Sequence, residues 1–354
     1  MSKVYISSVA SISSQRTFDN SEFLDEIIDH DDTVLSVVDP NYKDYIPPAA
    51  ARRMAKGIKM GVVASKIALQ EAELENVDAI ITGTGLGCTV DSEKFVSALI
   101  DNDEQYLTPT SFIQSTHNTV GGQIALGLGC KGYNFTYVHA SISFESALLD
   151  AQLQLENDEA STILVGGVDE SGDHTVKIHR LINHIKKEKV KSSSLFKSKT
   201  KGAVFSEGAN FFVLSNSKKN GAYAELGAVA TYNTLAKEDL NEALTVFLKE
   251  NHLDIDDIDI LVMGNNGDVA FDGWYHELSD GSFKNTPQVA FKHLCGEFYT
   301  ASAFGTWLAA KMIKAQRVPE IVKLNKEATT QINTVLLYNQ YRGENHSFTL
   351  LHKC

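Results

Sequence analysis

Residues 107–170 read LTPTSFIQSTHNTVGGQIALGLGCKGYNFTYVHASISFESALLDAQLQLENDEASTILVGGVDE, and this stretch decides the fold. Its two β-rich runs, FTYVHA at 135–140 and STILVGG at 161–167, are separated by a helical pattern. That pattern is apolar along one face, at positions i, i+3, i+4, i+7 and i+11, which hold Phe144, Ala147, Leu148, Ala151 and Leu155. A strand, an amphipathic helix and a second strand in succession indicate a layered α/β unit.

The same alternation extends over the whole chain. Further β-rich runs lie at residues 3–10, 77–83, 210–215, 258–264 and 333–338. Helical patterns such as AAARRMAKGIKMGVVASKIALQEA and NEALTVFLKEN lie between them, which predicts sheets covered by helices on both faces. A second, shorter series begins at GAYAELGAVATY (221–232), so we expect two similar halves, 1–218 and 219–354.

The composition limits the class of protein. Of the 354 residues, 43% are hydrophobic and 22% are charged, which suits a folded chain with a large core. The formal net charge of −13 gives no electrostatic reason to bind nucleic acid. The four cysteines are far apart and form neither a CxxC pair nor a zinc-type spacing, so we expect free thiols, no metal and no cofactor.

Targeting and membrane segments are not expected. The first residues, MSKVYISSVASIS, lack the sustained apolar run of a signal peptide. No stretch reaches the roughly 18 apolar residues that a spanning helix needs. The sequence therefore predicts a cytoplasmic protein without a membrane partner.

The order of motifs in residues 107–170 resembles the β-ketoacyl synthase family of the thiolase superfamily. That family has, in sequence, a PxxF segment, an N-x-x-x-G helix, a G-L-x-G-P strand, an A-C-x-S nucleophile turn and a G-G-x-E motif. The corresponding parts here are PTSF, NTVGG, GLGCKG, HASIS and GGVDE, and residues 205–226, 257–272 and 291–313 are also similar. The resemblance implies a thiolase-like α/β fold, in which two similar halves form a five-layered α/β/α/β/α sandwich.

The catalytic positions of the family are altered in this chain. The family uses a cysteine at a helix N-terminus, where the dipole and backbone amides lower the thiol pKa and hold the oxyanion. That position is Ser141 here, and its hydroxyl needs an adjacent base to act as a nucleophile. Counting without gaps, the two family histidines fall on Gly264 and Glu297, and only the family lysine remains, as Lys292. A carboxylate at 297 opposes the negative charge that develops during decarboxylation.

The C-terminal glycine loop also differs from the family. Where the family has a G-F-G-G turn with a gatekeeper phenylalanine, this chain has YRGEN at 341–345, and Arg342 is expected to replace the gatekeeper. An arginine that enters together with a glutamate suggests an ion pair between Glu297 and Arg342 inside the old cavity. A buried carboxylate without a partner would otherwise shift its pKa and become neutral.

Loss of the cysteine and both histidines favours a non-catalytic subunit. The resemblance implies a chain-length-factor-type protein that pairs with an active β-ketoacyl-ACP synthase, or with itself, and shapes the acyl tunnel. An acyl carrier protein is a further expected partner, in type II fatty-acid or polyketide biosynthesis, aryl-polyene-like systems included. The segment from Thr110 to His117 is then expected to reach the partner's pocket, and Phe112, Thr116 and His117 to influence product length.

Two alternatives stay open. A few thiolase-fold proteins use serine and act as acyltransferases, for which Ser141 would need His139 or His117 as its base. His139 lies two residues before Ser141, so both would face the same way along a strand, although a structural histidine is the simpler interpretation. His293, beside Lys292, is likewise expected to be a hydrogen-bonded core residue. The second alternative is a structural homodimer without a biosynthetic role.

One segment is basic in this acidic chain, at residues 174–201. The simplest interpretation is a solvated surface excursion. Relative to the P-F-D-x-x-R-D-G stretch of the family, Lys197, Lys199 and Lys201 stand where acidic residues are common. Such a patch would attract an acidic acyl carrier protein, or an acidic face of a partner subunit.

Overall fold

The computed structural model describes residues 2–20, 23–325 and 331–354. The strands are β1 Val4–Ile12, β2 Ala79–Gly83, β3 Tyr133–Tyr137, β4 Thr162–Asp169, β5 Gly208–Ser215, β6 Ala224–Thr234, β7 Ile260–Met263, β8 Gln288–Ala290, β9 Thr334–Gln340 and β10 Glu344–His352. The α-helices are α1 Pro48–Ala51, α2 Lys56–Glu71, α3 Thr89–Asp101, α4 Pro109–Ser115, α5 Thr119–Leu128, α6 Ser143–Glu156, α7 Asp173–Leu181, α8 Leu240–Glu250, α9 Gly273–Glu277, α10 Lys292–Cys295 and α11 Ser302–Ala315.

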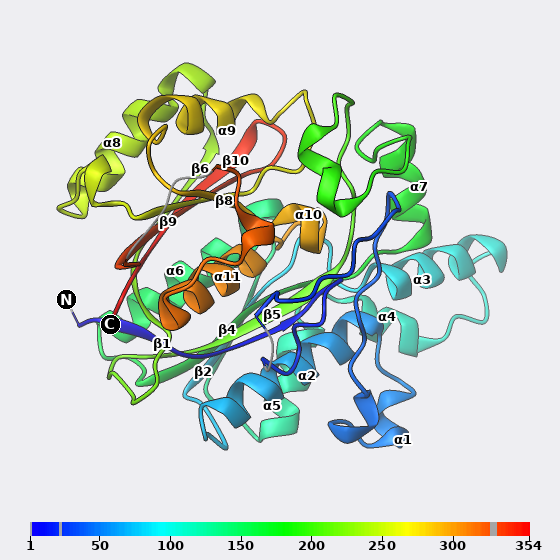
Figure 1. Ribbon diagram of the computed structural model, residues 1–354. Helices are drawn as coiled ribbons and strands as arrows, with labels where there is room; N and C mark the ends of the chain where they lie inside the picture. The colour runs from blue at the N-terminus through cyan, green and yellow to red at the C-terminus, as the bar shows by residue number, and fades with distance from the viewer. Residues whose placement is uncertain (1, 21–22, 326–330) are drawn as a thin grey trace.

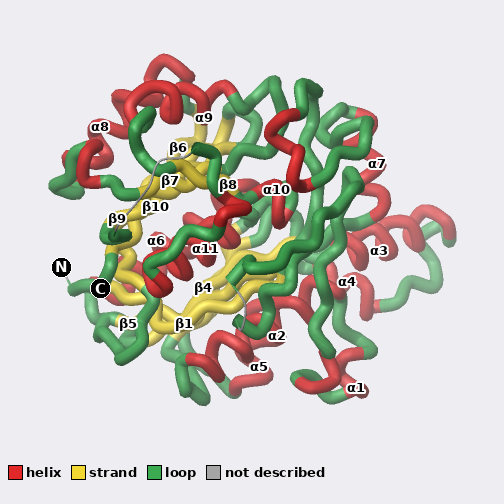
Figure 2. Tube along the Cα trace, in the orientation of Figure 1, coloured by secondary structure: helices red, strands yellow, loops and turns green. Residues whose placement is uncertain are grey.

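The described strands form one mixed sheet that is folded into two arms. Their order is β3-β2-β4-β5-β1-β6-β10-β9-β7-β8, and the arms join where β1 pairs antiparallel with β6. Figure 1 shows α2 and α5 on the outer face of one arm, α8 and α9 on the outer face of the other, and α6 and α11 between them. The same five layers can be followed in Figure 2. The predicted thiolase-like sandwich is therefore confirmed, whereas its division at residues 218 and 219 stays a proposal.

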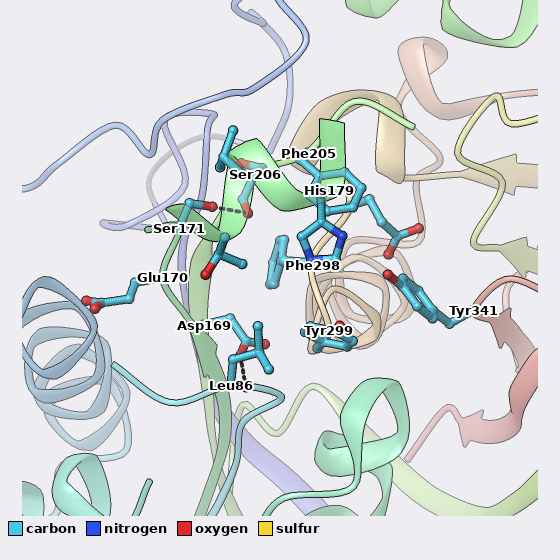
Figure 3. A pocket seen from close by; sticks show the side chains of 13 residues that line it. Leu86, Asp169, Glu170, Ser171, His179, Phe205, Ser206, Phe298, Tyr299 and Tyr341 are labelled. Atoms are coloured by element: carbon cyan, nitrogen blue, oxygen red, sulfur yellow. Dashed lines mark hydrogen bonds between the residues drawn. The ribbon is translucent and has the colours of Figure 1, made fainter. Parts of the chain in front are cut away.

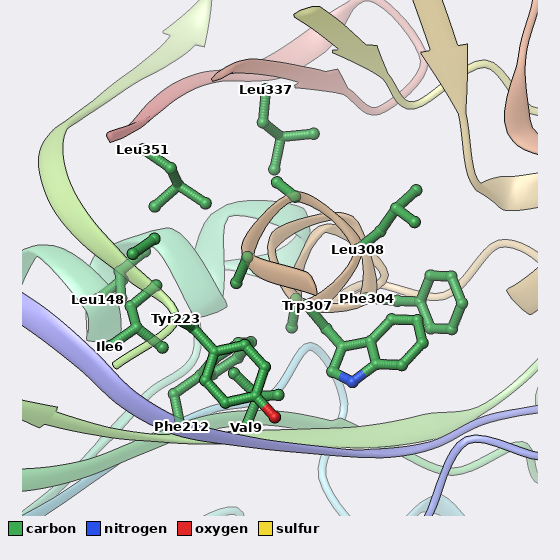
Figure 4. Packing of buried hydrophobic residues seen from close by; sticks show 14 of the residues in the cluster. Ile6, Val9, Leu148, Phe212, Tyr223, Phe304, Trp307, Leu308, Leu337 and Leu351 are labelled. Carbon is green, nitrogen blue, oxygen red and sulfur yellow. The ribbon is translucent and has the colours of Figure 1, made fainter. Parts of the chain in front are cut away.

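The middle layer is the most deeply buried part of the molecule. Helix α11 is buried on all sides from Ser302 to Ile313, as expected for a helix that is apolar around its whole circumference. Figure 4 shows the side chains of both sheet arms that pack around this helix. From one arm come Leu337 and Leu351, and from the other come Val9 and Phe212.

The parallel strands bring the candidate site to one edge. Because β2 runs parallel to both β3 and β4, the carboxyl ends of these strands meet at the same edge of the sheet. The turn with Ser141 follows β3, and Asp169 ends β4. In the other arm β7 is parallel to β8 and β9, and Gly264 follows β7 directly.

The chain leaves β3 earlier than the sequence pattern predicted. The strand ends at Tyr137, and Ala140 adopts a left-handed conformation with φ +49°. This residue turns the chain abruptly from the strand into α6. His139 and Ser141 therefore do not lie on one face of a strand, and that prediction is wrong.

Helix α6 lies so close to β2 that only glycine fits at position 83. A Cβ on Gly83 would lie 2.5 Å from the carbonyl oxygen of Ser143 and 2.7 Å from the amide nitrogen of Phe144. Both atoms belong to the backbone of the first turn of α6, so neither can move without displacing the helix. The glycine thus fixes the distance between the sheet and the turn that carries Ser141.

We predict that Gly83→Ala lowers the free energy of unfolding by about 3 kcal/mol, because the added methyl group overlaps backbone atoms. Urea denaturation of the purified variant measures the change. The control is Gly127→Ala in α5, where nothing lies within 4 Å of an added Cβ. There alanine should leave stability unchanged or raise it by up to about 1 kcal/mol. Equal effects of the two substitutions would contradict the close approach at Gly83.

Candidate functional site

Ser141 sits in a tight turn without a base. Its side chain is 2% exposed, and Oγ has no hydrogen-bond partner among the described residues. The imidazole of His139 points elsewhere, with Nδ1 3.2 Å from the Oγ of Ser146. His117 lies instead against Gly87, where an added Cβ would come within 3.1 Å of the imidazole. Among the described residues, neither histidine forms a hydrogen bond with Ser141.

The space beside Gly264 is occupied by other side chains. A Cβ at this position would lie 2.2 Å from Oδ1 of Asn339 and 2.9 Å from the hydroxyl of Tyr275. That hydroxyl is fixed, because it donates to the carbonyl of Gln340 and accepts from its amide. No side chain, least of all an imidazole, fits at position 264 without rearrangement of this group.

Glu297 is held in a buried ion pair with Lys292. The lysine Nζ lies 2.8 Å from Oε2 of Glu297, and the two side chains are 1% and 2% exposed. Asn266 donates a second hydrogen bond of 2.7 Å to the same oxygen. Its own Oδ1 accepts from the amide of Asp268, which fixes the orientation of the side-chain amide. The charge of Lys292 thus balances that of Glu297.

The predicted ion pair between Glu297 and Arg342 is wrong. Among the described residues the salt bridge of Arg342 is with Asp268, at 3.5 Å, and its guanidinium lies 4.4 Å from the ring of Phe271. The physical reason is proximity, since Lys292 lies only one short turn before Glu297 and is already buried beside it. A buried carboxylate is satisfied by the nearest cation with good geometry.

Tyr341, and not Arg342, faces the cavity at the gatekeeper turn. Arg342 has a left-handed φ of +56°, so adjacent side chains of the turn diverge. Figure 3 shows Tyr341 beside Tyr299 in a pocket that Glu297 also lines, and the two tyrosine rings are 5.3 Å apart. The other lining residues are Leu86, Asp169, Glu170, Ser171, Thr175, Val176, His179, Phe205, Ser206 and Phe298. Arg342 lines a different hollow on the protein, so the expectation that it takes the gatekeeper position stays a prediction.

Asp169 organises the floor of this pocket. Its carboxylate accepts hydrogen bonds from the amide and hydroxyl of Thr300, from the amide of Gly85 and from the hydroxyl of Thr84. Burial raises the pKa of Asp169, and these hydrogen bonds oppose the rise. The residue joins the end of β4 to the loop after β2 and to the start of α11. The sequence offered one clue, a carboxylate two residues after the glycine pair of a buried strand.

The loop after β7 is tied down by a second carboxylate. Asp272 accepts from the amide of Gly267 at 3.0 Å and from that of Asn266 at 3.3 Å. Burial raises the pKa of Asp272 to about 6, although the two amides lower it. The loop that presents Asn266 to Glu297 is therefore rigid. Sequence reasoning missed Asp272, Tyr275 and Asn339 as site residues, because none of them belongs to a catalytic position of the family.

The residues expected to influence product length lie on the surface of the chain. Phe112 is 54% exposed, and Thr116 and His117 are exposed as well. The ring of Phe112 contacts that of Phe95 in α3, with centroids 5.2 Å apart. This group is thus available to a neighbouring molecule and does not line the pocket around Glu297.

The described residues were also searched for metal sites and for membrane spans. They hold no group of three or more His, Cys, Asp or Glu side chains arranged to bind a metal ion. None of the described helices is long and apolar enough to cross a membrane.

Comparison with known proteins identifies similar sequences and structures. The family model for the β-ketoacyl synthase N-terminal domain matches residues 7–220. A 3-oxoacyl-[acyl-carrier-protein] synthase 2 from Staphylococcus aureus (strain N315) is 24% identical over 135 residues, which are 36% of this chain and 33% of the relative. The match thus spans about a third of the length of that curated relative.

Two solved structures share the whole fold. The ishigamide ketosynthase/chain length factor superposes with a TM-score of 0.80 and 17% identity over 99% of both chains. A ketosynthase in complex with its chain length factor from Xenorhabdus doucetiae also gives a TM-score of 0.80, with 14% identity over 100% of this chain and 98% of that one. At these identities the likeness establishes the fold.

The buried ion pair can be tested by removing one charge at a time. We predict that Glu297→Gln lowers the free energy of unfolding by about 3–5 kcal/mol, because it leaves the ammonium of Lys292 buried without a counter-charge. The double variant Lys292→Met/Glu297→Leu should recover most of this loss. Arg342→Ala, which removes a partly exposed pair, should cost about 1 kcal/mol or less. A double-mutant cycle in which Glu297 couples to Arg342 and not to Lys292 would contradict the observed pairing.

Stability should also depend on the protonation of His293. This core residue donates from Nε2 to the carbonyl of Ile321, and burial lowers its pKa to about 4. The unfolded imidazole binds a proton below about pH 6.5, so acidification from pH 6.5 to 4 favours unfolding. Between pH 7 and 5 we expect the wild type to lose about 2 kcal/mol more stability than His293→Gln, by urea denaturation. Asp272 titrates in the opposite direction in both proteins and cancels in the comparison, so equal pH slopes would refute this role of His293.

Proposed function

Because this chain belongs to the β-ketoacyl synthase family, we propose that it is a non-catalytic, chain-length-factor-type subunit. In this proposal it acts in the cytoplasm, pairs with an active β-ketoacyl-ACP synthase and shapes the acyl tunnel of the pair. The reaction would belong to type II fatty-acid or polyketide biosynthesis, aryl-polyene-like systems included, with an acyl carrier protein delivering the chain. The observation that carries the proposal is the buried Lys292–Glu297 pair at the former histidine position.

The site lacks what condensation chemistry requires. Decarboxylation develops negative charge, which needs hydrogen-bond donors or cations at the place where that charge appears. The position holds a carboxylate, and the lysine next to it is already neutralised by that carboxylate. At Ser141 the helix dipole contributes only about 1 kcal/mol, far too little to form an alkoxide without a base. Both halves of the reaction are therefore disfavoured in this chain.

The free edge of the sheet supports pairing with a second subunit. Strand β3 lies at the end of the sheet, and its aromatic side chains Tyr133, Phe135 and Tyr137 form a row that continues to His139. Tyr133 and Phe135 are each 45% exposed. A strand edge with unpaired backbone groups and an exposed aromatic row is a template for another strand, and stable monomers rarely leave one uncovered.

The predicted tunnel residues lie next to this edge. Helix α4, which carries Phe112, contacts α5, and α5 contacts β3. Ile113 and Leu126 on these two helices are 55% and 75% exposed, so the apolar surface extends from the strand to α4. A partner that pairs with β3 would cover Phe112, Thr116 and His117 as well, and this is where they would influence product length.

We predict that co-expression with an active β-ketoacyl-ACP synthase from a neighbouring gene yields a complex that survives gel filtration. Phe135→Asp should weaken this complex at least about tenfold, because a charge is placed in the centre of the interface. The matched control is Val246→Asp, also 45% exposed, in α8, a helix that covers the other arm of the sheet (Figure 1). Equal association of both variants, or no complex with the wild type, would contradict the proposed pairing.

The same complex separates this function from a serine acyltransferase. After incubation of the isolated chain with an acyl-carrier thioester, we expect no acyl mass shift on Ser141. In the complex, Ser141→Ala should leave the rate of condensation unchanged, whereas substitutions of Phe112 should alter the length of the product. Acylation of Ser141 in the isolated chain would overturn the non-catalytic proposal.

A further inference from the structure

The charge of this protein is strongly asymmetric. Residues 174–201 contain eight lysines, one arginine and one glutamate, which gives this segment a net charge of +8. The whole chain carries −13, so the remaining residues carry −21. Neither the condensation site nor the free edge of β3 uses this concentration of positive charge.

The cations of the segment point into solvent. We define the basic corner as its eight exposed basic residues, Lys177, Arg180, Lys187, Lys189, Lys191, Lys197, Lys199 and Lys201. Of these, Lys189 alone forms an ion pair with a carboxylate of the described residues, a solvent-exposed contact of 3.6 Å with Asp32. The other seven charges are not neutralised by salt bridges within the part of the chain that the structure describes.

Three large aliphatic side chains stand in the middle of these cations. Ile178, Leu181 and Ile182 are 57%, 81% and 50% exposed, and their i, i+3, i+4 spacing puts them on one face at the end of α7. The opposite face of the helix is anchored in the protein, since His179 packs on Phe205 with centroids 4.8 Å apart. The apolar face is therefore presented outward by a helix that cannot simply turn it inward.

The loop that follows α7 is fixed to the body of the protein by a buried lysine. The Nζ of Lys186 donates to the carbonyl of Gly267 at 2.8 Å, to that of Thr200 at 3.1 Å and to the Oγ of Ser198 at 3.0 Å. The basic corner is thus an ordered platform and not a tail. Figures 1 and 2 show α7 and this loop at the periphery of the molecule, away from the α6 and α11 layer.

We propose that the basic corner docks on an anionic lipid surface, with Ile178, Leu181 and Ile182 inserted among the headgroups. Clusters of basic residues beside an amphipathic helix bind anionic lipids, and exposed aliphatic residues add apolar burial. Two cations of the corner, Lys177 and Arg180, lie on α7, and the other six lie in the segment that follows it. This inference is independent of the proposed function, because it concerns a different surface and can be tested on the isolated chain.

The composition of the basic corner favours a lipid surface over a protein partner. Protein interfaces are enriched in Arg, Tyr, Trp and Met and depleted in Lys, and their energetic centres rarely consist of Leu. Here seven of the eight cations are lysines, and the exposed large hydrophobic residues of residues 174–201 are all aliphatic. Lysine is a flexible point charge that suits a diffuse layer of phosphates, whereas arginine suits a fixed bidentate contact.

The overall negative charge does not prevent this docking. At physiological ionic strength, charges are screened over about 8 Å, so a surface in contact with the corner experiences mainly the nearby lysines. The expectation of no membrane partner rested on the lack of a spanning segment, and peripheral docking needs none. The proposal departs from that expectation at this one surface.

Sedimentation with lipid vesicles tests the proposal. The isolated chain is mixed with vesicles of phosphatidylcholine alone or with about 30% phosphatidylglycerol, a fraction that gives a strongly negative surface. We expect binding to the anionic vesicles only, with an affinity that falls as salt rises. Each lysine near such a surface raises the partition coefficient roughly fivefold, so Lys197→Glu/Lys199→Glu/Lys201→Glu should lower it by about 100-fold or more.

The control carries the same change of net charge elsewhere. Lys43→Glu/Lys249→Glu/Lys284→Glu alters three exposed lysines outside residues 174–201 and should bind anionic vesicles nearly as well as the wild type. Leu181→Ser, at an exposed position, should weaken binding without loss of thermal stability.

Three results would overturn lipid docking. One is absence of wild-type binding to anionic vesicles, and another is equal loss of binding in both triple variants. The third is that the corner lysines are required to bind an acyl carrier protein while vesicles are ignored, which would make the corner a protein-binding surface. Failure of the proposed heterodimer would leave the vesicle result unaffected, so the two hypotheses can be judged separately.

Discussion

The buried ion pair between Lys292 and Glu297 is the interaction on which the interior of this protein depends. Two charges removed from water stabilise a structure only when their geometry is good and other hydrogen bonds satisfy the remaining atoms. Asn266 supplies one such bond from the loop after β7. The backbone of Glu297 is held separately, since its amide donates to the carbonyl of Val204 and its carbonyl accepts from the amide of Ser206. The pair therefore anchors the turn after α10, the loop after β7 and the segment before β5 in one place.

Under the proposed non-catalytic function, this anchor would also account for the loss of chemistry. A ketosynthase cavity needs groups that respond to developing negative charge, and such groups must be free to interact with substrate. Here the carboxylate of Glu297 and the ammonium of Lys292 form an ion pair with each other. The space next to Gly264 is occupied by the side chains of Asn339 and Tyr275. Restoring a histidine at 264 would first require these two side chains to move. The polar groups Lys292, Glu297 and Asn266 instead hold the surrounding segments together.

Sequence reasoning succeeded where the information is local or repeated along the chain. Alternating strands and helices predicted the layers of the fold, whereas the assignment of family histidine positions to Gly264 and Glu297 stays a prediction. Sequence reasoning failed at Ala140 and Arg342. Both residues adopt left-handed conformations, which the sequence does not predict for residues other than glycine. Each of these residues redirects the side chains beside it, so the pairs His139–Ser141 and Glu297–Arg342 did not form. The partner of Glu297 depended on three-dimensional proximity that motif order alone does not encode.

The exposed edge of β3 and the basic corner differ in how well water solvates them. An exposed row of aromatic rings on an unpaired strand edge is unfavourable in water. We therefore expect a partner at β3 to stay bound. The basic corner is the opposite case, because its lysines are well solvated without any partner. Binding there must displace water and counter-ions from each charge, and it weakens as ionic strength rises. The contact proposed at the sheet edge would therefore be permanent and the one proposed at the corner reversible, because apolar and charged surfaces are hydrated differently.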